Sequence, residues 1–185
     1  MRYRTIAASV IGLLGVAAIP SQAAILTFSI SANGAKEVTS TGTPNQGDPD
    51  GSAVGFILLN SGTGTGSTGS ATINLNLSNL DVGTLDLTGH HIHQAPATTT
   101  GAIVVDFGDP DTIRSGNTLS GTITGLPAVT IMSIFSNPTG FYYNLHNAQF
   151  TGGAVRDQLP EPGTIGVVGV AVVGLLARRR SRNAA

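Results

Sequence analysis

Apolar and polar residues alternate along most of the chain between Ala24 and Leu159, which is the pattern of half-buried β-strands. The alternation is cleanest where Ile73, Leu75 and Leu77 are separated by polar residues. Glycine-rich turns separate most of the predicted strands. These strands cover residues 26–31, 54–59, 72–77, 87–93, 102–107, 118–124, 141–147 and 154–159.

One segment departs from this pattern. Residues 128–135, which lie between Pro127 and Pro138, have the apolar character and the boundaries of a short helix. Seven or eight short strands joined by turns predict an all-β fold, a single antiparallel β-sandwich or barrel.

The first 23 residues are predicted to be a secretory signal peptide with a helical core. Arg2 and Arg4 precede an uncharged apolar stretch, Ile6 to Ile19, and small residues follow it up to Ala23. The alternative is an uncleaved membrane anchor, for which the apolar stretch is short. Cleavage after Ala23 would export the rest of the chain.

Residues 160–185 have three parts. The triplet Pro160, Glu161 and Pro162 is followed by the apolar run 164–177, a predicted short helix, and then by Arg178, Arg179 and Arg180. This order resembles the PEP-CTERM sorting signal of exported bacterial proteins, and the resemblance implies recognition and cleavage by an exosortase. Such a helix spans about 21 Å, less than a hydrocarbon core of about 30 Å. The arginines would stay cytoplasmic and help to anchor it. The alternative is an unprocessed tail anchor.

The segment between these two ends is acidic and contains no cysteine. It carries nine acidic and three basic residues, so its net charge is −6, whereas the whole chain has a net charge of −1. We therefore expect no binding to nucleic acid through a basic patch. The absence of cysteine excludes a thiol nucleophile and a cysteine-ligated zinc.

Three of the four histidines lie together on the predicted strand 87–93. Alternate residues of a strand share a face, so His91 and His93 point the same way, whereas His90 shares the face of Ile92. The fourth, His146, lies on the predicted strand 141–147. If these strands are close, His91, His93 and His146 can form a three-nitrogen site for copper or zinc.

A structural polar cluster is the alternative, and the missing fourth ligand favours it at this stage. In that cluster the histidines would bond to Asn144, Arg156 or backbone carbonyls and order the loop 94–100. Arg156 is expected to pair with Asp157, Asp106 or Glu37. The chain has no Gly-x-Ser-x-Gly element. We therefore expect neither enzymatic activity nor a cofactor other than copper or zinc.

Residues 24–159 resemble the CHRD domain through six short motifs that occur in the family's order. The resemblance implies an immunoglobulin-like β-barrel. Asn147, Ala154 and Asp157 depart from the family pattern. The motifs are Gly34-Ala35-Lys36-Glu37-Val38, Gly51-Ser52-Ala53, His91-Ile92-His93, Gly101-Ala102-Ile103-Val104, Tyr143-Asn144-Leu145-His146 and Gly153-Ala154-Val155-Arg156-Asp157-Gln158-Leu159.

These features predict an exported CHRD-domain protein of the cell envelope or extracellular matrix, with a non-catalytic role in binding or adhesion. Signal peptidase and an exosortase would process it, and the C-terminal helix would anchor it transiently in the membrane. A polysaccharide or a protein would be its partner outside the cell. The second hypothesis is a copper- or zinc-binding envelope protein that uses the three histidines.

Overall fold

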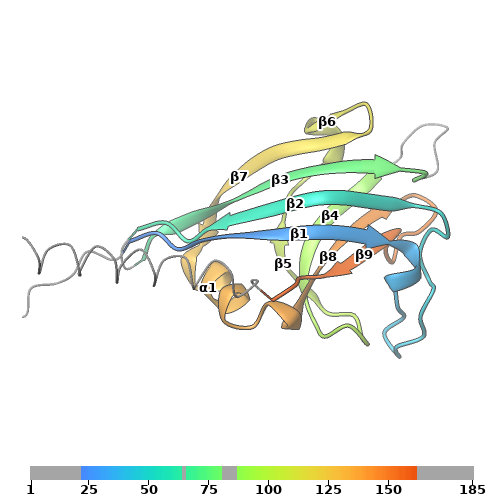
Figure 1. Cartoon of the computed structure of the whole chain (residues 1–185), viewed down its shortest axis with the longest axis horizontal. Helices are drawn as coiled ribbons and strands as arrows, with labels where there is room; N and C mark the ends of the chain where they lie inside the picture. Colours follow the sequence, from blue (N-terminus) through green and yellow to red (C-terminus); the bar gives the residue numbers. More distant parts are fainter. Residues whose placement is uncertain (1–21, 64–65, 81–86, 162–185) are drawn as a thin grey trace, which may run out of the picture.

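The computed structural model describes residues 22–63, 66–80 and 87–161. Within these ranges the strands form one antiparallel sheet with the order β5-β4-β8-β9-β1-β2-β3-β7-β6, and this sheet curls around an apolar core (Figure 1). The strands are β1 (Ile25–Asn33), β2 (Ser52–Asn60), β3 (Thr68–Ser78), β4 (Leu87–Gln94), β5 (Ala102–Asp106), β6 (Arg114–Ser115), β7 (Thr118–Pro127), β8 (Phe141–Asn147) and β9 (Val155–Gln158).

The all-β prediction is confirmed for the described residues, and each predicted strand segment overlaps an observed strand. The predicted helix is α1 (Ala128–Ser136). Three short 3₁₀ turns complete the fold: η1 (Gly34–Lys36), η2 (Pro110–Thr112) and η3 (Pro138–Gly140).

The sheet is continuous rather than split into the two separate layers of a sandwich. Its two halves, β5-β4-β8-β9 and β1-β2-β3-β7-β6, meet where Asn33 of β1 pairs with Arg156 of β9. Because that junction is a single residue pair, the sheet can bend sharply there and enclose its core like half a barrel. The immunoglobulin-like arrangement stays a prediction.

The period-two pattern explains which side chains fill the core. One face of β1 and one face of β3 are apolar and buried, as shown by Phe28 and Ile30 on β1 and by Ile73 and Leu75 on β3. Helix α1 lies at one end of the curled sheet and adds Ile131 to this core (Figure 1). Burial of such side chains contributes about 1.5–3 kcal/mol each, which makes the core the main source of stability.

Several predictions fall outside the described residues. They are the signal helix up to residue 21, Pro162, the apolar run 164–177 and Arg178, Arg179 and Arg180. Within the part of the chain that is described, no helix has the length and apolar character needed to cross a membrane.

Candidate metal centre

Strand pairing brings the two histidine-bearing strands together. In the β4–β8 ladder His91 lies beside Asn144, His93 beside Tyr142, and Gly89 beside His146. Because side chains alternate, Ile92 and Tyr143 point into the core. The side chains of His91, His93 and His146 therefore gather on the opposite face of the sheet.

The rings of His91, His93 and His146 converge on one another. One nitrogen from each ring lies within 4.8 Å of the other two. The ring centroids are 5.1 Å apart for His91 and His146, 5.5 Å for His91 and His93, and 5.9 Å for His93 and His146. The structure thus brings together all three residues that the sequence singled out for metal.

Each of these rings has one nitrogen that is shielded from solvent and has no hydrogen-bond partner. These atoms are Nδ1 of His91, Nε2 of His93 and Nε2 of His146. In a neutral imidazole one ring nitrogen carries the proton and the other offers a lone pair. The free nitrogens are metal ligands if the opposite nitrogens hold the protons.

The opposite nitrogens do face hydrogen-bond acceptors. Nδ1 of His93 lies 2.9 Å from the carbonyl oxygen of Gly101, and Nδ1 of His146 lies 3.0 Å from that of Thr151. A carbonyl oxygen can only accept, so both Nδ1 atoms donate and both Nε2 atoms keep a lone pair. Nε2 of His91 is 3.5 Å from Oδ1 of Asp106, its cross-strand neighbour. A carboxylate favours the proton on that nitrogen.

The surroundings also keep the rings uncharged. Burial lowers the pKa of His91, His93 and His146, and the repulsion among neighbouring histidines lowers the pKa of His93 and His146 further. The Asp106 carboxylate and the two carbonyl contacts act in the opposite direction. Since burial is the largest cause for each ring, neutral imidazole, the form that binds metals, is favoured.

Gly89 makes room for the ring of His91. A Cβ atom at position 89 would lie 2.8 Å from Cε1 of His91, closer than a normal contact. No role was predicted for Gly89 from the sequence. The available signal was a glycine inside a strand, which often marks such a close approach.

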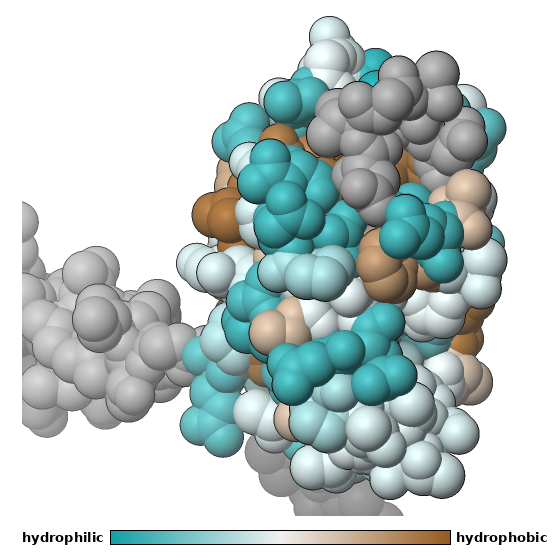
Figure 2. Space-filling model, turned by 90° about the vertical axis from the view of Figure 1, so that its right-hand side faces the viewer, coloured by the Kyte–Doolittle hydropathy of each residue, from teal (hydrophilic) through white to brown (hydrophobic). Residues whose placement is uncertain are grey.

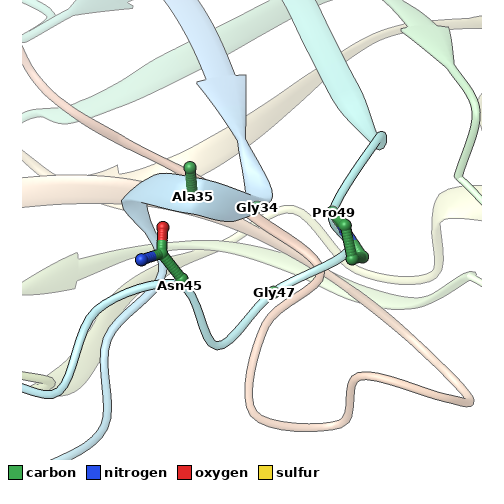
Figure 3. Close-up of a pocket in the computed structure, with 5 residues that line it drawn as sticks. All are labelled: Gly34, Ala35, Asn45, Gly47 and Pro49. Atoms are coloured by element: carbon green, nitrogen blue, oxygen red, sulfur yellow. The ribbon is translucent and has the colours of Figure 1, made fainter.

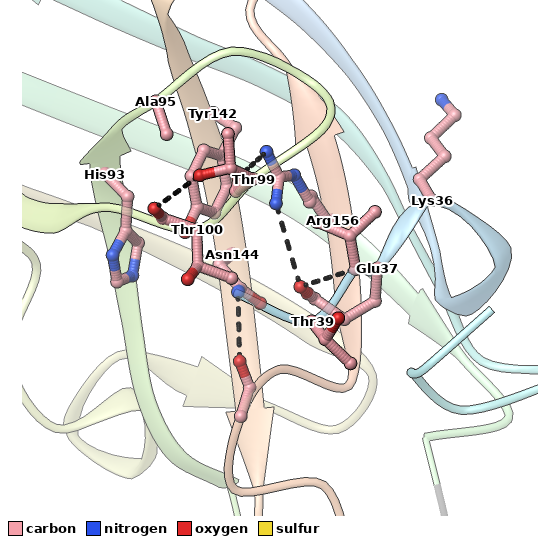
Figure 4. Close-up of polar contacts among 12 residues, drawn as sticks. Lys36, Glu37, Thr39, His93, Ala95, Thr99, Thr100, Tyr142, Asn144 and Arg156 are labelled. Carbon is pink, nitrogen blue, oxygen red and sulfur yellow. Dashed lines mark hydrogen bonds and ion pairs between the residues drawn. The ribbon is translucent and has the colours of Figure 1, made fainter. Parts of the chain in front are cut away.

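A second layer of contacts holds His93 in place. Its ring stacks on Tyr142 with the centroids 4.9 Å apart and an angle of 8° between the planes. The guanidinium carbon of Arg156 lies 3.5 Å from the centroid of the Tyr142 ring. Figure 4 shows Tyr142 between His93 and Arg156. The position of His93 therefore depends on a stack of three planar groups.

Arg156 also fastens the loop that carries the Gly101 carbonyl. Its Nη2 donates to the carbonyl oxygens of Pro96 and Thr99, each at 2.9 Å. The Gly101 N–H donates to the Tyr142 hydroxyl at 3.3 Å. The structural cluster predicted from the sequence is thus present in part: the histidines bond to backbone carbonyls beside an ordered loop, and Arg156 supports that loop directly.

Of the three acidic partners predicted for Arg156, the structure pairs it with Glu37. Nη1 of Arg156 is 3.9 Å from Oε1 of Glu37, and both side chains are almost fully buried (Figure 4). Burial raises the pKa of Glu37, although the Val38 N–H, the Arg156 charge and the Asn144 side chain oppose the rise. Asp157 instead pairs with Lys36 at 2.7 Å.

His90 lies on the core face, as its position in the alternation predicts. Its ring stacks on Phe107 with a centroid distance of 5.1 Å, and neither of its ring nitrogens has a hydrogen-bond partner. Burial lowers the pKa of His90 to about 4. His90 therefore packs as a neutral aromatic ring and takes no part in the metal centre.

A separate pocket of about 280 Å³ lies at the turn that follows β1 (Figure 3). Figure 2 shows the end of the molecule that carries this turn, where hydrophilic and weakly polar residues cover most of the surface. The pocket offers no acid, base or metal ligand for chemistry. Its lining consists of Gly34, Ala35, Asn45, Gly47 and Pro49.

Comparison with known proteins agrees with the motifs. The family model of the CHRD domain matches residues 28–159, and that of the PEP-CTERM protein-sorting motif matches residues 158–180. No curated protein and no solved structure matches the chain significantly. The sorting motif implies an exported, envelope-associated protein that an exosortase processes. The chain belongs to the CHRD domain family.

Proposed function

We propose that this exported protein binds one copper or zinc ion in the cell envelope through His91, His93 and His146. The observation that supports the proposal is the convergence of the three rings, in which one nitrogen of each ring lies within 4.8 Å of the other two. Each ring also has one buried nitrogen without a hydrogen-bond partner. We further propose that the protein uses the ion for binding rather than for catalysis.

A purely structural cluster explains these nitrogens poorly. A buried polar atom without a partner costs about 1–3 kcal/mol, so three such atoms at one place are unfavourable in a cluster that serves stability alone. A cation would give all three lone pairs a partner at once. The geometry therefore reverses the preference that the sequence suggested.

The distances require only a small adjustment. Ligand nitrogens bind copper or zinc at about 2.0–2.1 Å, so two nitrogens of one site lie at most about 4.2 Å apart. The three nitrogens lie within 4.8 Å of one another. Rotation of the rings would have to close the remaining gap.

Metal analysis of the purified full-length chain tests the proposal. After loading with Cu²⁺ or Zn²⁺ and dialysis, we expect about one ion per chain, and the His93→Ala variant should retain almost none. The matched control is His90→Leu, which removes a histidine from the opposite face and should keep its ion. Equal metal content in wild type and His93→Ala, or none in either, would refute the site.

A second candidate function is binding of a neutral polysaccharide on the outer face of β1, β2, β3 and β7. That face is free of charge although the domain is acidic, and the apolar side chains of Val54 and Phe56 are exposed among its hydroxyl and amide groups. The cross-strand rows are Ile25, Asn60, Ser70 and Thr124; Thr27, Leu58, Thr72 and Thr122; Ser29, Phe56, Asn74 and Ser120; and Ser31, Val54, Asn76 and Thr118.

Co-sedimentation with insoluble cellulose tests this second candidate. A neutral glycan would stack on Phe56, so Phe56→Asp should abolish retention. Val129→Asp is the matched control, because Val129 is exposed on α1 and lies outside the face. Retention that is the same in both variants would argue against the polysaccharide.

Processing at the two ends completes the proposal. We propose that signal peptidase removes residues 1–23 and that the run 164–177 anchors the chain in the membrane until the exosortase acts. Mass spectrometry of the mature protein tests both steps. An intact arginine-rich end in the envelope fraction would argue against cleavage at the sorting motif.

A further inference from the structure

We propose that the metal centre keeps one coordination position open for a small anion from solution, which the ion binds in exchange for water. This inference rests on the proposed function, because it requires an ion at His91, His93 and His146. The open position is the part of the ion's coordination sphere that the three histidines do not fill.

The number of ligands supplies the first argument. Among the described residues, the histidine, cysteine, aspartate and glutamate side chains that converge here are His91, His93 and His146. Structural zinc sites almost always have four protein ligands, whereas sites with three protein ligands hold water or another small molecule in the fourth position. Three imidazoles therefore indicate an open site.

The nearest carboxylate is already engaged elsewhere. Oδ1 of Asp106 lies 3.5 Å from Nε2 of His91, whereas the free nitrogen of that ring is Nδ1. Asp106 thus lies behind the ligand ring, where it orients the ring and holds its proton. In that place Asp106 is a positioning residue.

The charge of the ligand set favours an anion. All three ligands are neutral imidazoles, so a divalent ion would keep its full charge of +2 at the centre. A bound ion of this kind is the largest local charge and attracts negative groups. The buried Arg156 guanidinium, on the other side of Tyr142 from His93, adds positive charge to the same region.

Access from solvent is available on one side of the centre. His93 is buried against Tyr142, whereas His91 and His146 are partly exposed, and 16% of the His91 side chain is accessible. The approach to the ion therefore lies along the rings of His91 and His146.

Azide titration of the Cu²⁺-loaded full-length protein tests the proposal. We expect a new azide-to-copper absorption band that saturates with increasing azide, while the histidines stay bound and copper stays oxidised. The His90→Leu variant, which is altered on the opposite face of the strand, should give the same band at a similar azide concentration. The Asp106→Asn variant, once loaded with copper, should also show the band, because Asp106 does not occupy the open position.

Two results would overturn the open position. One is a copper-loaded protein whose spectrum does not respond to azide. The other is an azide band that appears only in Asp106→Asn, which would make Asp106 the fourth ligand. In both cases copper is bound, so the proposed function would stand. A protein that binds no copper would instead refute the proposed function itself, and the open position with it.

Discussion

At the scale of single residues, the proposed metal centre depends on which nitrogen of each histidine ring faces a hydrogen-bond acceptor. The carbonyl oxygens of Gly101 and Thr151 accept hydrogen bonds from Nδ1–H of His93 and His146, and this leaves both Nε2 atoms without a proton. In His91 the two ring nitrogens have the opposite roles, because Asp106 faces Nε2 and Nδ1 has no partner. Such contacts behind a ligand commonly set metal affinity.

The first prediction concerns Gly89. The substitution Gly89→Ala should weaken Zn²⁺ binding about 10- to 100-fold, because the new Cβ would lie 2.8 Å from Cε1 of His91 and displace the ring. Isothermal titration calorimetry measures the affinity. Far-ultraviolet circular dichroism should stay that of the wild type, since a side chain can move more easily than the strand. Unchanged affinity would mean that the ring of His91 does not need this space.

The second prediction concerns His90 in the metal-free protein. The pKa of His90 falls from 6.5 to about 4 on folding, so the unfolded chain binds a proton that the folded chain excludes. The contribution of His90 to the free energy of unfolding should therefore fall by about 3 kcal/mol as the pH drops from 6.5 to 4, and it should not change above pH 6.5.

Urea unfolding at several pH values, with a chelator present, measures this pH dependence. The His90→Leu variant has no titrating group at this position and should lose less stability on acidification than the wild type. An identical pH dependence in the two proteins would show that His90 titrates normally in the folded state.

At the scale of elements, β4, β8 and β9 act together with the loop 95–101. Arg156 of β9 reaches across Tyr142 of β8 and binds two carbonyl oxygens of that loop, while Gln158 of β9 donates to the carbonyl of Ala95 at 2.9 Å. The Gly101 carbonyl at the end of this loop accepts the hydrogen bond from His93. The contacts among these three strands and the loop thus hold the His93 side chain in position.

The third prediction follows from the burial of Arg156. Replacement by methionine leaves Glu37 buried without a compensating charge and should cost about 3–5 kcal/mol in the free energy of unfolding. The double variant Arg156→Met with Glu37→Gln should recover part of the loss. Urea unfolding checks both, and a double variant as unstable as the single one would show that the two side chains are not coupled.

At the scale of the whole molecule, one face of the curled sheet packs on the core and the other carries the proposed metal centre. The centre joins β4 and β8 to the two loops whose carbonyls bind the histidines. A bound ion would therefore tie together segments that come from distant parts of the chain. It should stabilise the native state, because the unfolded chain does not hold these histidines in one place.

The fourth prediction is a metal-dependent melting temperature. Zn²⁺ at 100 times its dissociation constant should stabilise the native state by about 2.7 kcal/mol, which raises the melting temperature by about 5–10 °C for a domain of this size. Differential scanning fluorimetry measures the shift, and a chelator should reverse it. His146→Ala should show no shift. An equal shift in that variant would place the bound zinc elsewhere.

The sequence by itself determined the local structure of the domain and the PEP-CTERM sorting motif. A period of two places His91 and His93 on one face and His90 on the other, whatever the tertiary arrangement, because alternation is a property of each strand. The sequence also predicted the strands, helix α1 and the CHRD and PEP-CTERM motifs, since each depends on residues that are close together in the chain.

Only the tertiary structure decided what depends on distance through space. It placed His146 beside the β4 histidines, because β4 pairs with β8 across a long stretch of sequence. It also selected Glu37 among the three possible partners of Arg156, and the carbonyls of Gly101 and Thr151 as the proton acceptors. A backbone carbonyl is present at every residue, so no sequence pattern could have marked those two.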